Sequence, residues 1–128
     1  MLNRRKLLAD GKLLGRWGEK RCEIFLKKQG LKKLANNYTC RAGEIDLIMV
    51  DGSGAIVFVE VKTRTNEDFE AVESVITQNK KTKLTKTARY FLMANEIANR
   101  PCRFDIVTIV LGRKGRPQIR HYKTAFIP

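Results

Sequence analysis

The chain has 128 residues, the size of one domain, and 43% of them are hydrophobic, which is enough for a core. It carries 26 Lys and Arg residues against 13 Asp and Glu residues, a net charge of +13, and these cations are spread along the chain in the manner of a nucleic-acid-binding protein. No apolar run approaches the roughly 20 residues of a membrane span, and Cys22, Cys40 and Cys102 with the lone His121 form no zinc pattern. We therefore expect a single cytoplasmic domain that occupies residues 1–128, has reduced cysteines and makes no contact with membrane.

The first elements are predicted from hydrophobic spacing. Residues 1–12 are basic and weakly patterned, so we expect them to be loosely ordered. Apolar residues at helical spacing predict a helix over 13–29, with Gly30 at its C-cap and Trp17 packed in the core. Residues 31–41 are typical of a modest strand that is weakened in its middle by Asn36 and Asn37.

A hairpin is the clearest prediction, with strands over 43–50 and 55–64 and a turn over 51–54. A three-residue loop pairs residue 51 with 55 and places Asp46 opposite Glu60. A two-residue loop would put these carboxylates on opposite faces of the sheet. We predict the three-residue loop, because Gly54 supplies the left-handed glycine that such a turn requires.

The second half is predicted to close the sheet. Residues 65–78 are polar and acidic and indicate a loop with a short helix at its end, after which Asn79 caps a helix that runs to about residue 95. A buried strand over 103–112 and an extended segment over 118–122 follow. The expected order is α-β-β-β-α-β-β, an α/β fold with a mixed central sheet flanked by helices.

Asp46 and Glu60 are candidates for a metal site. Carboxylates that face each other repel unless a cation lies between them, and Mg²⁺ commonly takes one or two carboxylates and several waters. Lys62 lies on the same strand face as Glu60 and is suited to hold a water or steady a phosphate. The alternative is a solvated face with weak ion pairs, but the very apolar run before Glu60 favours a site.

The segments "GEIDLI" and "VFVEVKTR", together with "GRWGE", "NNYTCRAGEIDLI" and "RFDIVTI", cover most of the chain. They closely resemble the YraN-like family of uncharacterised bacterial proteins, which by its pattern belongs to the PD-(D/E)XK nucleases together with archaeal Holliday junction resolvases. The resemblance implies a restriction-endonuclease-like core, Mg²⁺ or Mn²⁺ as cofactor, DNA as substrate and a homodimer.

The same resemblance assigns roles to individual residues. It implies that Asp46 and Glu60 bind metal, that Lys62 is catalytic and that Glu19 lies beside the metal. Glu19 can equally be an ordinary acid near the start of its helix. Glu44 is expected to help position a ligand.

The second long helix is predicted to contact phosphates, because no acid occurs between residues 73 and 96. Its basic residues are Lys80, Lys81, Lys83, Lys86 and Arg89. Gln78 lies near the position of a glutamine in related nucleases, and Arg64 follows the strand of Glu60, where it is suited to bind a phosphate.

Two functions follow from the sequence. The first is a divalent-metal-dependent endonuclease that hydrolyses DNA, branched or flapped, with DNA favoured over RNA. The second is a non-catalytic module that keeps the fold and binds nucleic acid or a partner protein.

Overall fold

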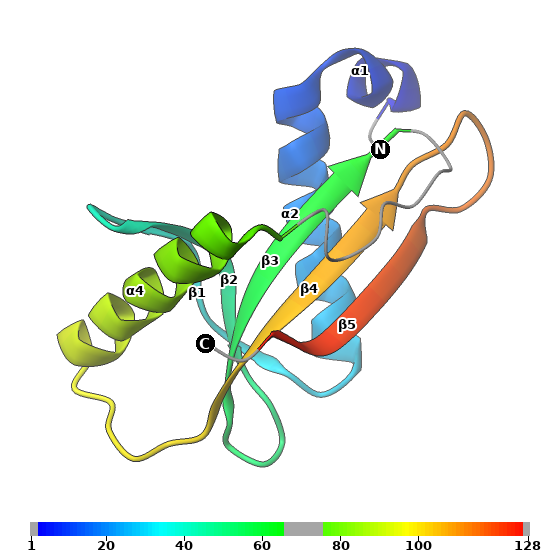
Figure 1. The fold of residues 1–128 in the computed structure, drawn as a ribbon. Coiled ribbons are helices and arrows are strands. Elements are labelled where there is room, and N and C mark those ends of the chain that lie inside the picture. Colours follow the sequence, from blue (N-terminus) through cyan, green and yellow to red (C-terminus); the bar gives the residue numbers. More distant parts are fainter. Residues whose placement is uncertain (1–2, 66–75, 127–128) are drawn as a thin grey trace.

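The computed structural model describes residues 3–65 and 76–126. Its elements in chain order are α1 (Arg4–Ala9), α2 (Gly11–Lys28), β1 (Lys32–Cys40), β2 (Gly43–Val50), β3 (Ile56–Arg64), α4 (Gln78–Ala94), β4 (Cys102–Val110) and β5 (Gln118–Phe126). The strands form one five-stranded sheet in sequence order, antiparallel throughout except between β3 and β4. The helices α2 and α4 lie on opposite faces of this sheet (Figure 1). The predicted mixed α/β fold is confirmed.

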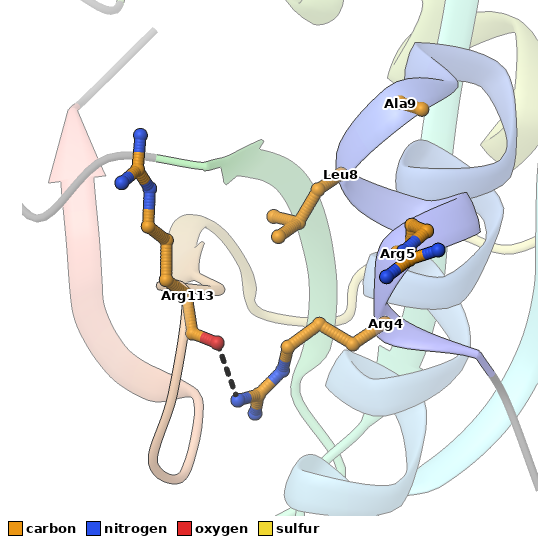
Figure 2. Close-up of a pocket in the computed structure, with 5 residues that line it drawn as sticks. All are labelled: Arg4, Arg5, Leu8, Ala9 and Arg113. Atoms are coloured by element: carbon orange, nitrogen blue, oxygen red, sulfur yellow. Dashed lines mark hydrogen bonds between the residues drawn. The ribbon is translucent and has the colours of Figure 1, made fainter.

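The N-terminal segment differs from the prediction, because residues 4–9 form helix α1 instead of loosely ordered chain. The Asn3 side chain caps this helix, and Leu7 is buried among other leucines beside α2. Arg4 donates a hydrogen bond to the carbonyl of Arg113 at 3.1 Å (Figure 2). It also donates to the carbonyl of Gly115. This contact ties α1 to the turn between β4 and β5.

Both ends of α2 follow local rules. The Asp10 carboxylate accepts hydrogen bonds from the backbone N–H groups of Lys12 and Leu13, so the helix begins earlier than the predicted residue 13. At the other end Gly30 adopts φ +94° and its N–H donates to the carbonyl of Lys27. The predicted glycine C-cap is therefore confirmed.

The hairpin between β2 and β3 has the predicted three-residue loop. The N–H of Asp51 donates to the carbonyl of Ala55 at 3.0 Å, and Gly54 has φ +89°. The Asp51 carboxylate also accepts hydrogen bonds from Ser53 and from the N–H of Ala55. This loop sets the register of the two strands that carry the candidate site.

Helix α4 begins slightly earlier than predicted. Thr77, and not Asn79, is its N-cap, and the Thr77 hydroxyl accepts a hydrogen bond from the N–H of Lys80. The short helix that was predicted at the end of 65–78 falls largely on residues 66–75, outside the described residues. Because β3 and β4 are parallel, the chain must return across the sheet between them, and α4 lies on that return path (Figure 1).

Each face of the sheet has its own core. Under α4 the core contains aromatic residues from several elements, among them Phe58, Phe91 and Phe104. Under α2 it contains mainly aliphatic residues of β2, β3 and β4. Across residues 3–65 and 76–126, no helix is both long and apolar enough to span a membrane, and the expected cytoplasmic location stays a prediction.

Candidate active site

Asp46 lies at the point where β2 and β3 stop pairing. The ladder runs from Val50 and Ile56 to Leu47 and Val59, in the predicted register, and ends one pair short of Asp46 and Glu60. There the Asp46 side chain takes over from the main chain, because its Oδ2 accepts a hydrogen bond from the N–H of Val61 at 2.8 Å. This bond fixes the Asp46 carboxylate at the gap between the two strands.

A break in strand alternation accompanies this position. Ile45 and Ile48 are three residues apart, yet both pack in the core under α4, where strict alternation would separate them. On the neighbouring strand, Ala35 and Tyr38 pack against the same core at the same spacing. Between them Asn37 adopts the left-handed φ of +50°. Each strand therefore has two residues, and not the usual one, between successive positions that face α4.

The additional residues interact with side chains of α2, on the other face of the sheet. Asn37 makes a side-chain hydrogen bond to Glu19 of α2, and it opposes the rise that burial causes in the pKa of Glu19. Burial likewise raises the pKa of the Cys22 thiol on α2, and the charge of nearby Asp46 adds to that rise. Asp46 and Asn37 thus lie within electrostatic reach of the helix that carries Glu19.

Glu60 is buried and held by two lysines. Its side chain is only 6% exposed, and its Oε2 lies 2.6 Å from the Nζ of Lys80 and 3.4 Å from the Nζ of Lys62. Burial alone would lower the pKa of Lys80, but its hydrogen bond with Glu60 and the charges of Glu60 and Asp46 together outweigh burial, and the pKa is raised. In this state the lysines supply the positive charge that a buried carboxylate needs.

Asp46 and Glu60 lie close enough to influence each other strongly. Burial raises the pKa of the Asp46 carboxyl to about 7, and the charge of Glu60 and a hydrogen bond with it push in the same direction. The N–H of Val61 opposes this shift. Burial, more than any other factor, therefore disfavours a negative charge on Asp46, and a cation bound beside the two carboxylates would stabilise that charge.

Glu19 reaches this pair because α2 packs closely on β3. A Cβ added to Gly18 would lie 2.0 Å from the Oγ1 of Thr63, so only glycine permits this approach. Burial raises the pKa of Glu19, and the charges of Glu44 and Glu60 raise it further. Glu19 thus belongs to the same electrostatic cluster. This favours the interpretation that Glu19 is part of the candidate site over the alternative that it is an ordinary acid near the start of its helix.

The donor set fits a hard divalent cation. Buried Glu60 and half-buried Asp46 are neighbouring carboxylates of the kind that Mg²⁺ commonly uses as ligands, and water or phosphate can complete its shell. Within residues 3–65 and 76–126 no three His, Cys, Asp or Glu side chains are already arranged to hold a metal. A cation bound beside Asp46 and Glu60 would require Lys80 to give up its contact with Glu60.

Of the remaining predicted site residues, two are exposed and one is half-buried. Glu44 is exposed on β2, within electrostatic reach of Glu19, and Gln78 is exposed at the start of α4. Arg64 ends β3 half-buried, where it donates to the carbonyl of Thr63 at 3.1 Å.

The cations of α4 do not act as one set. Lys80 belongs to the site, whereas the Nζ of Lys81 lies 5.9 Å from the centre of the Phe126 ring. The side chains of Lys83, Lys86 and Arg89 are exposed. These three are therefore the most exposed cations of the predicted phosphate-contacting surface, whereas Lys80 and Lys81 are half-buried.

Sequence reasoning did not identify Asn37 or the role of Asp105. The signal for Asn37 was an asparagine pair inside a strand, because Asn tolerates the left-handed conformation. Asp105 is fully buried and lies 3.1 Å from Arg103 Nε and 2.8 Å from His121 Nε2, and it accepts from the N–H of Thr124 at 3.0 Å. Its pattern, an acid in a buried strand, resembles that of Glu60, but its partners are structural.

The family comparison covers the part of the chain that carries these residues. The model of the uncharacterised protein family UPF0102 matches residues 18–109, which include β1 to β3, α4, all of β4 except Val110, and the candidate site residues. The chain belongs to this family. A UPF0102 protein of Pelotomaculum thermopropionicum is 39% identical over 93% of the chain and all of its own length. Those of Lachnoclostridium phytofermentans and Neisseria meningitidis serogroup C are 43% and 45% identical, over 80% and 74% of the chain and 82% of their own lengths. The stated resemblance to YraN-like proteins is confirmed at the level of the family.

Proposed function

We propose that this member of UPF0102 is a divalent-metal-dependent endonuclease that hydrolyses phosphodiester bonds, with DNA favoured over RNA. The observation that carries the proposal is the pair of neighbouring carboxylates, buried Glu60 and half-buried Asp46, with Lys62 and Lys80 beside it at the gap between β2 and β3. Composition supports the substrate class, since a net charge of +13 favours a polyanion.

The residues divide the work in a consistent way. Asp46 is oriented by the N–H of Val61, so its second carboxylate oxygen points to a fixed place. Lys62 lies beside Glu60, where it can orient a water and offset the charge that develops on the phosphate. The chemistry that a bound Mg²⁺ or Mn²⁺ supplies is polarisation of the phosphoryl oxygen and activation of water.

The test uses duplex, flap, four-way and single-stranded DNA, and the matching RNAs, with Mg²⁺ or Mn²⁺. Wild type should cut at least one of them. Asp46→Asn, Glu60→Gln and Lys62→Ala should each lower the cutting rate by at least about a hundredfold and leave binding intact. Glu96→Gln is the matched control, because it removes an exposed carboxylate that follows α4 and is not part of the candidate site.

The second candidate, a non-catalytic nucleic-acid-binding or partner-docking module, is favoured by one observation. Glu60 already has its charge satisfied by Lys80 at 2.6 Å. Binding to several of these substrates without cutting of any would refute the nuclease proposal and support the module.

We also propose that the active form is a homodimer, since cutting both strands of a branched junction requires two sites. Light scattering of the purified protein, alone and with a four-way junction, measures this directly. A monomer in both conditions would refute it.

A further inference from the structure

A second basic region lies away from the carboxylates, around α1. One face of α1 lines the open cavity drawn in Figure 2, of about 490 Å³. Different residues of α1 line another cavity, of about 550 Å³, together with the first half of α2. Its lining includes Lys6, Leu7, Leu13, Arg16, Trp17 and Lys20. The volume lies in the range of small-molecule sites, roughly 300–1,000 Å³.

The charges around this second cavity are all of one sign. Lys6, Arg16 and Lys20 contribute three cations, and no acid is among the residues that line it. Over residues 3–65 and 76–126 none of the three makes an ion pair. Cations gathered around one concave surface repel one another, and an anion bound there relieves this repulsion.

Trp17 adds an apolar wall to the cavity. It is half-buried and packs against the core under α2 and against the small cluster of Leu7, Leu14 and Leu111. The sequence prediction of a core tryptophan is therefore only part of its role, because Trp17 also lines the cavity. A tryptophan held by packing on one side presents its remaining surface with little loss of entropy on binding.

We propose that this cavity binds a single-stranded segment of nucleic acid, with a base against Trp17 and phosphates on Lys6, Arg16 and Lys20. Such sites combine cations that follow the backbone with an aromatic surface for a base. A duplex keeps its bases stacked on each other, so it cannot offer one to a concave pocket. The proposal rests on the proposed function for its choice of nucleic acid as the polyanion.

The cavity is also well placed relative to the carboxylates. Arg16, Trp17 and Lys20 line it, while Gly18 in the same helical turn packs on Thr63, and Glu19 lies within reach of Glu60. One turn of α2 therefore borders both the cavity and the acidic site. A branched or flapped substrate has a single-stranded arm beside its duplex, and this arrangement suits it.

The test uses the fluorescence of Trp17, which is the only tryptophan of the chain. The full chain is titrated with a single-stranded oligonucleotide, a blunt duplex of equal phosphate content and inorganic polyphosphate. We expect saturable quenching by the single strand, with at least about fivefold weaker binding of the duplex, because stacking of one base is worth about 1–3 kcal/mol. Equal quenching by duplex or by polyphosphate would overturn the proposal.

Charge reversal then locates the site. The double variant Arg16→Glu/Lys20→Glu should weaken the single-strand titration at least tenfold more than Lys28→Glu/Lys32→Glu. The latter pair is exposed, changes the net charge equally and does not line the cavity. Circular dichroism confirms that both variants are folded. Equal weakening by the two pairs would overturn the proposal.

The experiment is independent of catalysis. Run on Glu60→Gln without metal, the quenching reports the cavity alone. If wild type cuts no substrate but quenching is selective for single strands, the nuclease proposal fails and the cavity stands. If cutting occurs without quenching, the cavity proposal fails and the nuclease stands.

Discussion

The close approach of α2 to β3 predicts opposite effects for two glycines of one helix. Gly15→Ala and Gly18→Ala make the same chemical change only three residues apart in α2. At Gly15 an added Cβ meets nothing within 4 Å. At Gly18 it would lie 2.0 Å from the Oγ1 of Thr63 and 2.9 Å from both its Cβ and its Cγ2.

The magnitudes follow from two opposing effects. Replacement of glycine by alanine within a helix stabilises by about 1 kcal/mol, and this gain applies to both positions. At Gly18 the new methyl overlaps a β-branched side chain that cannot swing away freely, and overpacking of this kind costs about 1–3 kcal/mol. Because the helix gain cancels between the variants, Gly18→Ala should be about 1–3 kcal/mol less stable than Gly15→Ala.

Urea unfolding followed by circular dichroism measures both free energies of unfolding. Thr63→Ala in the Gly18→Ala background removes two of the three close atoms and should restore part of the loss. If Gly18→Ala and Gly15→Ala agree within about 0.5 kcal/mol, the packing of α2 on β3 described above is wrong. The placement of Glu19 would then lose its support as well.

Other predictions concern charge. Asp105→Asn should destabilise the fold by about 3 kcal/mol, because it removes the buried carboxylate that Arg103, His121 and the N–H of Thr124 share. Burial alone would raise the pKa of Asp105, but its hydrogen bonds with His121, Thr124 and Arg103 together outweigh burial and lower the pKa. The stability of the wild type should therefore fall as pH drops below about 4, and that of the variant should fall less. Urea unfolding at each pH measures both. Lys80→Met should bind Mn²⁺ about threefold to tenfold more tightly than Lys86→Met, because the ion pair between Lys80 and Glu60 no longer has to break. Calorimetry measures both affinities, and equal values would contradict the prediction. Binding of DNA should weaken steeply with salt, and a flat dependence would argue against phosphate contacts.

Local rules account for much of the fold. The turn chemistry of Asp51 to Gly54 predicted the loop length, and the loop length then determined which residues of the two strands face each other. Gly30 likewise ended α2 where its conformational freedom was needed. In each case the outcome depended on a few neighbouring residues, which a sequence displays directly.

The features of the fold that the sequence did not predict have a different origin. Helix α1 is six residues long, too short to be stable alone, and it forms because Leu7 is buried and Arg4 holds a distant turn. The left-handed Asn37 depends on what packs around β1 and β2. Such features arise from contacts between residues far apart in sequence, so hydrophobic periodicity does not predict them.

The candidate site was predicted in composition and only partly in geometry. The pairing of Asp46 with Glu60 followed from the register, but the strands separate before that pair, and the Asp46 carboxylate instead accepts a hydrogen bond from the N–H of Val61. Lys80 was expected to meet phosphate and instead lies 2.6 Å from Glu60. Contacts between side chains of different helices and strands do not follow from sequence spacing, and only the three-dimensional structure reveals them.

The parallel pairing of β3 with β4 has a consequence for how the chain folds. The β2–β3 hairpin is local and can form early, whereas β4 can join β3 only after the chain has passed through α4. Asp46 and Glu60 come with the hairpin, and Lys80 comes with the later crossover. Two acids therefore meet with only Lys62 beside them before Lys80 arrives, so the hairpin alone carries part of their electrostatic repulsion, and ionic strength or a free divalent cation should speed the folding of this half of the chain.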